Sequence, residues 1–307
     1  MNKSILITGA NAGIGKDTAR QLALLDTTEK IYLACRNEEK AKVAKKELEE
    51  TTGKNIFEIV VLDTSKPESV KAAVENLNES IDALIMNAGG MGGKNPETIT
   101  KDGVMQLFAS NVLGHVVLVE ELIKADKLNN VVLFASSEAV RGVKKMGMKP
   151  VSLKSSSADE FASIIDGTFF GEKMDPMEAY GYVKYTATQW MASLARKHTN
   201  IRFINMSPGA TKGTEVMNDM KFPMNIIFKY IAMPVLMPLM GMVHSLEKGA
   251  KRFVDGITDE SLISGTFYAS KANQTAGPII DQSSIFPDLN NTLFQDNANE
   301  AIHLFIN

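Results

Sequence analysis

The sequence of 307 residues has little of several things that define specialised classes of protein. It contains one cysteine, Cys35, which excludes a disulfide framework within the chain, and its four histidines show no clustering at metal-ligand spacing. Its charges nearly cancel, with 33 Lys and Arg against 36 Asp and Glu, so we expect no nucleic-acid partner. These absences indicate a protein of the reducing cytoplasm without a structural metal.

Apolar stretches near the start and in the last third are interrupted before they reach membrane-spanning length. The first residues, MNKSILITGA, hold an apolar run too short for a signal-peptide core, and we expect a strand there. The segment from Met217 to Val243 holds seven of the 17 methionines, but three prolines and Lys229 interrupt it. We expect an apolar lid at about 212–245, with plain core packing or peripheral contact with a membrane as alternatives.

Short apolar runs rich in β-branched residues alternate with longer segments of helical period, a pattern typical of βαβ units around a buried parallel sheet. Strands are expected at Ser4–Thr8, Lys30–Cys35, Ile56–Leu62, Ala83–Met86, Val131–Ser136, Ile201–Met206 and Gly265–Ala269. Helices are expected near Gly13–Leu25, Glu38–Glu50, Pro67–Leu77, Val104–Ala125, Glu178–Lys197, Leu246–Gly256 and Thr292–Phe305. The predicted fold class is α/β, a single domain over residues 1–307 with a doubly wound parallel sheet of about seven strands.

Two local signals refine this prediction. Ser65 and Glu68 have the spacing of a capping box, and Pro67 suits the first turn of the helix that follows. The stretch from Arg141 to Asp175 shows neither a strand nor a clear helical pattern and is too long for an ordinary connection. We expect a substrate-side insertion at about 141–178.

A glycine-rich stretch, T-G-A-N-A-G-I-G over residues 8–15, follows the first predicted strand directly. Glycines there allow a tight turn and close approach to a pyrophosphate, which the free N–H groups and dipole of the next helix attract. The expected cofactor contacts in this glycine loop are Gly9, Asn11, Gly13, Ile14 and Gly15. A purely structural turn is the alternative, but the position between a strand and a helix is the context that a dinucleotide site requires.

The second predicted strand ends at Cys35 and is followed by Arg36, where an NAD-selective site would place a carboxylate for the ribose 2′-hydroxyl. A guanidinium can instead bind a 2′-phosphate, so the sequence favours NADP(H) over NAD(H). The alternative is that Arg36 is a solvated charge at a strand end. After the third strand, Asp63, with Thr64 beside it, is placed to accept a hydrogen bond from an adenine amino group.

Tyr180 and Lys184 are four residues apart and lie on one face of a predicted helix. A phenol of pKa about 10 is poorly matched to proton transfer at neutral pH, and we expect the neighbouring ammonium to lower that pKa. The pair alone occurs by chance in many proteins. Other candidate site residues come at or near the ends of predicted strands or within a helix: Asn87, Ala88, Gly89, Asn111 and Ser137.

The order of these pieces, ending with Pro208-Gly209, resembles the short-chain dehydrogenase/reductase family from Lys3 to about Ala269. The resemblance implies a Rossmann-type fold and a catalytic tetrad of Asn111, Ser137, Tyr180 and Lys184. It also implies cofactor contacts from Asn87, Ala88, Gly89, Tyr180, Lys184, Pro208, Gly209 and either Thr211 or Thr214. Two departures stand out: Val183 replaces the serine that commonly precedes the lysine, and Thr214 falls one position late. Family members are commonly dimers or tetramers, so the resemblance implies a homodimer, unless the insertion blocks a helix face used for assembly.

Within that family, the phrases LACRNEEKA, ASNVLGH and PGATKGTE look like those of retinol dehydrogenases and protochlorophyllide reductases. The resemblance implies an NADP(H)-dependent oxidoreductase that transfers a hydride between NADPH and a lipophilic carbonyl or alcohol, with Tyr180 as acid and base. Two alternatives remain. The insertion before Tyr180 is similar to that of the light-dependent protochlorophyllide reductases, which act on a C=C bond, and a non-catalytic scaffold that senses NADP(H) belongs to a different class.

Overall fold

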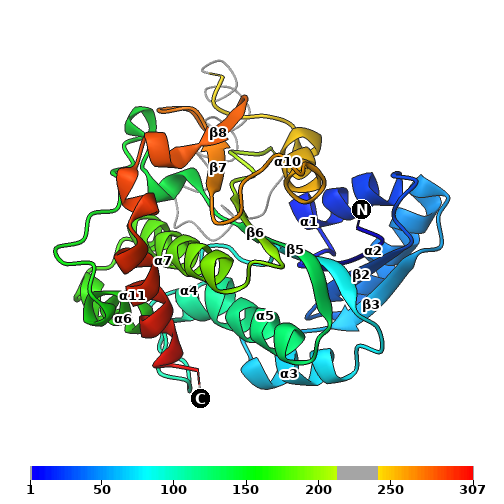
Figure 1. Cartoon of the computed structure of the whole chain (residues 1–307), viewed down its shortest axis with the longest axis horizontal. Helices are drawn as coiled ribbons and strands as arrows, with labels where there is room; N and C mark the ends of the chain where they lie inside the picture. Colours follow the sequence, from blue (N-terminus) through cyan, green and yellow to red (C-terminus); the bar gives the residue numbers. More distant parts are fainter. Residues whose placement is uncertain (1, 213–240, 307) are drawn as a thin grey trace.

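The computed structural model describes residues 2–212 and 241–306 of the chain (Figure 1). The strands are β1 Ser4–Thr8, β2 Lys30–Cys35, β3 Phe57–Val61, β4 Ile81–Met86, β5 Leu128–Ala135, β6 Arg202–Met206, β7 Phe267–Ser270 and β8 Ile279–Asp281. They form one sheet in the order β3-β2-β1-β4-β5-β6-β7-β8, parallel throughout except for the antiparallel pair β7 and β8. The predicted α/β class with a doubly wound, mainly parallel sheet is confirmed.

Helices cover both faces of this sheet (Figure 1). The longer ones are α1 Gly13–Ala23, α2 Glu38–Thr52, α3 Pro67–Glu75, α5 Gly114–Lys124, α6 Ala158–Asp166, α7 Pro176–Lys197, α10 Leu246–Thr258 and α11 Thr292–His303. Leu22 of α1 and Phe253 of α10 are buried in the core of one face, whereas Val116 of α5 and Trp190 of α7 are buried in that of the other. Burial of each such side chain contributes about 1.5–3 kcal/mol. The two cores hold the carboxyl ends of the strands in fixed relative positions.

The helix predicted at Val104–Ala125 is a continuous run from Gln106 to Lys124 that changes its winding. It begins with α4 Gln106–Phe108, passes through a π-helical turn at Ala109–Leu113 and continues as α5. By length and composition this run is apolar enough to cross a membrane, but 72% of its apolar stretch is buried inside the protein. It is therefore a core helix, and its π turn lies at Asn111 on the side of the sheet where the predicted site residues gather.

The insertion contains a helix that the sequence analysis missed. Ser157 caps α6 by accepting a hydrogen bond from Glu160 N at 3.2 Å, and the Glu160 carboxylate accepts hydrogen bonds from the backbone N–H groups of residues 154–156. The expectation of no helix between Arg141 and Asp175 was therefore wrong, because a serine and a glutamate at capping-box spacing begin one there. α6 and α11 pack together and on α7 as an additional layer (Figure 1).

The capping box predicted at Ser65 was also wrong. Ser65 Oγ donates to Asp63 Oδ1 at 2.7 Å, and α3 begins after Lys66 without a side-chain cap, although Pro67 does occupy its first turn. The eighth strand, β8, was not predicted because it spans only three residues after a proline. Most of the predicted lid at 212–245 lies outside the described residues, which omit 213–240.

A partly exposed ion pair joins α11 to α5. His303 Nε2 lies 2.6 Å from Glu120 Oε1, and this hydrogen bond raises the pKa of His303. A raised histidine pKa stabilises the fold below the unfolded value of about 6.5, and this stabilisation is lost as pH rises through the folded value. Because solvent screens the pair, we expect His303→Gln to lower the free energy of unfolding by only about 0.5–1 kcal/mol at pH 6, and by less at pH 8.5.

Urea denaturation at the two pH values measures this difference. The control is His198→Gln, since His198 forms no ion pair among the described residues. An equal loss at both pH values for His303→Gln would contradict an ionic contribution.

Candidate active site

The glycine loop turns from β1 into α1 and leaves the helix N-terminus open. Ala12 precedes α1 with extended backbone and provides no side-chain cap, and the first turn of α1 contains no acidic residue. By contrast, side chains of Asn37, Asp175 and Asn291 cap α2, α7 and α11. Free N–H groups at a helix start bind anions, so α1 fits a pyrophosphate. A dinucleotide therefore matches this end of the sheet.

Close packing around the glycine loop requires a small residue at position 15. A Cβ on Gly15 would lie 2.6 Å from Gly9 O and 2.5 Å from Asn87 Nδ2. Asn87 Nδ2 itself donates to Thr8 O at 2.8 Å, and Ala88 N donates to Thr8 Oγ1 at 2.9 Å. Asn87 and Ala88 thus tie the end of β4 to the loop. Within that loop, Asn11 and Ile14 are partly buried and Gly9 and Gly13 have positive φ angles.

Cys35 ends β2 beside this loop, Arg36 follows it, and Asp63 and Thr64 follow β3. Cys35 is buried, and burial raises its pKa to about 11 although backbone N–H groups of the loop oppose the shift. Arg36 is exposed and has no hydrogen bond or ion pair with any residue that the structure describes. Asp63 accepts hydrogen bonds from Ser65 through Oδ1, and the Thr64 carbonyl packs against Gly114. A guanidinium is thus available where a 2′-phosphate is expected.

Ser137 and Tyr180 meet at the carboxyl end of β5. Ser137 follows β5 and caps the short 3-10 helix η2 Glu138–Val140, with Oγ accepting a hydrogen bond from Ala139 N at 3.2 Å. α7 packs against η2, and the Ser137 hydroxyl lowers the pKa of the Tyr180 phenol through a hydrogen-bonding interaction. The predicted serine and tyrosine are therefore brought together from positions 43 residues apart in the sequence.

Lys184 lies on the same face of α7 and points to the end of β5. Its Nζ donates to Ala135 O at 2.9 Å and lies 4.7 Å from the Phe134 ring centroid and 5.5 Å from the Tyr180 ring centroid. The ammonium is buried, and burial lowers its pKa to about 7. The low dielectric around Lys184 thus disfavours its charged form, so only part of the amine is protonated at neutral pH.

The phenol of Tyr180 does not have the depressed pKa that we expected from Lys184. Burial raises that pKa to about 12, the Ser137 hydroxyl opposes the rise, and the Glu138 carboxylate adds to it. The prediction of a lowered pKa was wrong because desolvation disfavours the phenolate and Lys184 contacts the ring face instead of the oxygen. Tyr180 is therefore protonated throughout the neutral range.

Asn111 occupies the π turn and faces the loop after β4. Its Nδ2 donates to Gly90 O and Leu107 O, each at 2.8 Å, and its Oδ1 accepts a hydrogen bond from Gly90 N at 3.1 Å. A Cβ on Gly89 would lie 2.5 Å from Asn111 Oδ1 and 3.5 Å from Lys184 Nζ. Asn111 and Lys184 thus both approach Gly89, so all four members of the predicted tetrad gather at one edge of the sheet.

Sequence reasoning missed the role of His115. Its Nδ1 lies 3.0 Å from Asn111 O, which can only accept, so Nδ1 carries the proton and Nε2 accepts from Thr8 Oγ1 at 2.9 Å. Complete burial lowers the pKa of His115 to about 3 and keeps the ring neutral. The available signal was its position four residues after Asn111 on the same helical face.

The turn after β6 brings the last predicted cofactor residues to the same edge. Gly209 has a positive φ of 73°, Pro208 O lies 2.6 Å from His244 Nε2, and Thr211 Oγ1 donates to Gly209 O at 3.0 Å. Thr214 lies outside the described residues. Of the two alternatives for the carboxamide contact, the structure therefore describes Thr211 alone.

An open helix start after β1 and a Ser, Tyr and Lys cluster beyond β5 define a dinucleotide-binding protein of the doubly wound α/β class. Residues 3–149 match the family model described as short chain dehydrogenase. The chain is 32% identical over 210 residues to dehydrogenase/reductase SDR family member 12 of Bos taurus, an alignment that covers 67% of this chain and 60% of that protein. It is 37% identical over 125 residues to human retinol dehydrogenase 11, covering 40% and 38% of the two chains.

Solved structures show the same fold. Levodione reductase superposes with a TM-score of 0.62 at 21% identity, and a 3-ketoacyl-(acyl-carrier-protein) reductase from Brucella melitensis complexed with NADH superposes with 0.57 at 19%. Both comparisons cover 86% of this chain and 94% of the other. The chain belongs to the short-chain dehydrogenase/reductase family of oxidoreductases. It spans about 60% of the length of the family member 12 proteins that it matches.

The buried amine of Lys184 should reduce stability. Its folded pKa of about 7 lies below the unfolded value of about 10.4, so unfolding takes up a proton and is favoured below pH 10, fully so below pH 7. We expect Lys184→Met to raise the free energy of unfolding by about 1–3 kcal/mol at pH 6, after loss of the bond to Ala135 O, and to lose this gain toward pH 10.

Guanidinium denaturation of the cofactor-free protein at pH 6 and pH 10 measures the gain. Lys197→Met, an exposed position on the same helix, is the control and should show no such pH dependence. A Lys184→Met variant less stable than wild type at pH 6 would show that the buried amine does not destabilise the fold.

Proposed function

We propose that this protein uses NADP(H) to interconvert a lipophilic carbonyl compound and its alcohol, with Tyr180 as the proton donor and acceptor. The observation that carries the proposal is the packing of α7, with Tyr180 and Lys184, against the short helix that Ser137 caps, at the sheet edge that also presents the glycine loop. The family membership supports an oxidoreductase, and Arg36, which has no hydrogen bond or ion pair with any described residue, supports the phosphorylated cofactor.

Each residue of the cluster has a distinct task in this proposal. The start of α1 and Arg36 would hold the cofactor, whose nicotinamide supplies the hydride when it is bound. Ser137 would donate a hydrogen bond to the substrate oxygen, where negative charge grows as the carbonyl is reduced. Tyr180 would give that oxygen its proton. Asn111 keeps the loop at Gly89 and Gly90 in place.

The raised pKa of Tyr180 favours one direction. A phenol that stays protonated at neutral pH can donate to an alkoxide, which is the stronger base, without first taking up a proton from solvent. Alcohol oxidation needs the phenolate, which is scarce at pH values well below the pKa of about 12. The group therefore supports proton donation in carbonyl reduction at neutral pH, and alkaline solution favours its role as the base in alcohol oxidation.

The aromatic rings of the insertion support a lipophilic substrate. Phe169 and Phe170 of the insertion pack on Tyr182 of α7, with ring centroids 4.8 and 5.8 Å away, and both remain partly exposed. Partly exposed aromatic rings packed on the helix that carries Tyr180 suit an apolar carbonyl compound. The names of the retinol dehydrogenases that the chain matches are consistent with such a substrate.

Tyr180→Phe tests the proton donor. We expect turnover with NADPH and lipophilic aldehydes, assayed in darkness, to fall by about 10²–10⁴-fold, because only the phenolic proton is removed. NADPH affinity should stay within about twofold, since the ring remains. The matched control is Tyr182→Phe, whose hydroxyl bonds to Ser152 O at 3.1 Å and not to the cluster.

A Tyr180→Phe variant with wild-type turnover would refute the acid assignment. Tight NADPH binding by wild type without reduction of any aldehyde or ketone would favour a cofactor-sensing scaffold instead. Activity that requires light and a tetrapyrrole would favour the protochlorophyllide-type reductase.

Arg36→Gln tests the choice of cofactor. Loss of a charge-assisted contact to the 2′-phosphate should weaken NADPH binding by about tenfold or more and leave NADH binding unchanged. Fluorescence titration with both cofactors measures the change. Lys46→Gln on α2 removes the same charge from an exposed position and is the control. An unchanged preference in Arg36→Gln would mean that Arg36 is only a solvated charge.

A further inference from the structure

A buried ion pair lies directly behind Ser137. Glu138 follows Ser137 in the chain, Arg252 comes from α10, and Glu138 Oε1 lies 3.5 Å from Arg252 Nη1. The two residues are 4% and 6% exposed, whereas every other ion pair among the described residues has at least one side chain exposed to a third or so. Buried charges are costly, and replacing such a pair with apolar residues often stabilises a protein. Stability alone is therefore a weak reason for the pair.

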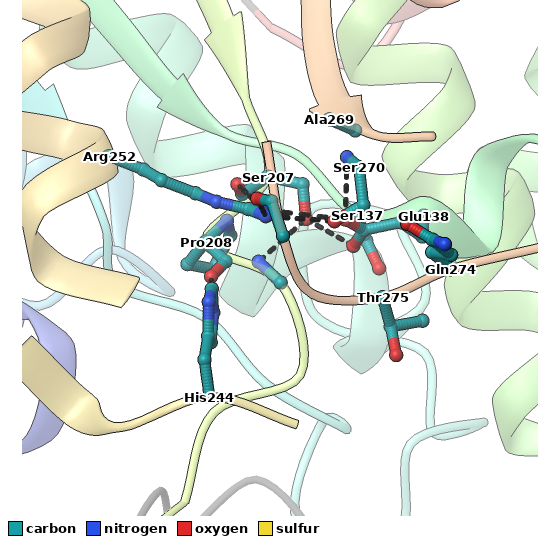
Figure 2. Close-up of polar contacts among 12 residues, drawn as sticks. Ser137, Glu138, Ser207, Pro208, His244, Arg252, Ala269, Ser270, Gln274 and Thr275 are labelled. Atoms are coloured by element: carbon teal, nitrogen blue, oxygen red, sulfur yellow. Dashed lines mark hydrogen bonds and ion pairs between the residues drawn. The ribbon is translucent and has the colours of Figure 1, made fainter. Parts of the chain in front are cut away.

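The pair joins the carboxyl ends of three strands. Glu138 Oε1 accepts hydrogen bonds from Ser270 N at 3.2 Å and from Ser270 Oγ at 3.0 Å, and Oε2 accepts one from Ser207 Oγ. Arg252 donates to Ser207 O at 2.9 Å, to Ser270 Oγ at 2.8 Å and to Gly277 O at 2.8 Å. Figure 2 shows Arg252 reaching toward Glu138 with Ser207 and Ser270 around the pair. The ends of β5, β6 and β7 are thus locked to α10.

The same contacts extend to the Pro208–Gly209 turn. Ser207 Oγ, which donates to Glu138, accepts a hydrogen bond from Gly209 N at 3.0 Å. A Cβ on Gly209 would lie 2.8 Å from Arg252 Nη1, so the turn packs directly on the guanidinium. Ser137 is thereby held on one side of the ion pair and the turn on the other.

We propose that Glu138 and Arg252 are positioning residues that fix the Pro208–Gly209 turn relative to Ser137, and so align the nicotinamide half of the bound cofactor with the proton-transfer groups. Among the described residues, neither residue contacts Tyr180 or Lys184 through a hydrogen bond, and both hold the turn through Ser207, Gly209 and the backbone of Ser137. The Glu138 charge also acts on Tyr180 at a distance, by adding to its raised pKa. The inference rests on the proposed function because it assigns the nicotinamide half to this turn. The adenosine half depends on the glycine loop and Arg36, which the pair does not touch.

Glu138→Gln is the sharpest test. The amide keeps the shape of the carboxylate but turns an NH₂ group toward a donor, either Ser207 Oγ or Ser270, and removes the countercharge of Arg252. We expect NADPH affinity to fall by about fivefold or more, because a buried donor loses its acceptor. The affinity for 2′,5′-ADP, which lacks the nicotinamide half, should stay within about twofold. We expect kcat to fall by about tenfold or more as alignment is lost.

Arg252→Lys provides a second variant that keeps the charge but cannot bridge Ser207 O, Ser270 Oγ and Gly277 O together. It should show the same loss of NADPH over 2′,5′-ADP affinity. Two controls lie on α10: Lys251→Met removes an exposed charge whose partner is Asp255, and Ile257→Ala removes buried apolar contacts without touching the network. Lys251→Met should change neither affinity nor thermal stability. Ile257→Ala should lower thermal stability and leave the ratio of NADPH to 2′,5′-ADP affinity unchanged.

Equal loss of both affinities in Glu138→Gln and Arg252→Lys, or loss of thermal stability alone, would overturn the proposal and make the pair structural. The binding comparison needs no turnover. If wild type binds NADPH but reduces no carbonyl compound, the proposed function fails while the ratio of NADPH to 2′,5′-ADP affinity still decides the role of Glu138 and Arg252.

Discussion

One buried hydroxyl holds the cofactor side of the sheet together. Thr8 Oγ1, at the end of β1, accepts a hydrogen bond from Ala88 N and donates to His115, which in turn donates to Asn111 O. These contacts join β1, β4 and the π turn at the point where the strand order of the sheet reverses. Each group is buried or nearly so, and leaving one without its partner costs about 1–3 kcal/mol. The three elements can therefore adopt only the arrangement in which Asn111 faces the loop after β4.

The buried amine of Lys184 works against stability. Lys184 loses hydration beside Phe134, which lowers its pKa, whereas burial raises the pKa of the partly buried Tyr180 phenol and keeps it protonated. Such perturbed groups cluster where proteins carry out chemistry. The surrounding core is large enough to hold them, since Trp190 and Tyr185 of α7 are almost completely buried. Apolar burial in the cores offsets the cost of keeping the Lys184 amine out of water.

The sequence allowed the architecture and the membership of the cluster to be predicted, because strand periodicity and the order of the motifs are encoded locally. What it could not provide were properties that depend on three-dimensional surroundings. The predicted direction of the Tyr180 pKa shift was wrong because burial disfavours the phenolate and Lys184 lies over the ring face. Spacing along a helix reveals neither. α6 was missed although Ser157 and Glu160 signalled it, whereas Ser65 and Glu68 gave the same signal without a cap. Glu138 and Arg252, 114 residues apart, carried no pattern that linked them.

Two polar clusters therefore flank the proposed reaction centre, and they divide the strands between them. Thr8 and His115 hold β1, β4 and the helix of Asn111, while Glu138 and Arg252 hold β5, β6 and β7. Because both clusters are buried and hydrogen-bonded, the edge of the sheet is rigid where a cofactor would lie. The aromatic rings of the insertion are partly exposed and contact the cluster only through α7. Under the proposed function, chemistry would lie on locked strand ends and substrate choice on the adjacent insertion, so the two properties could change independently.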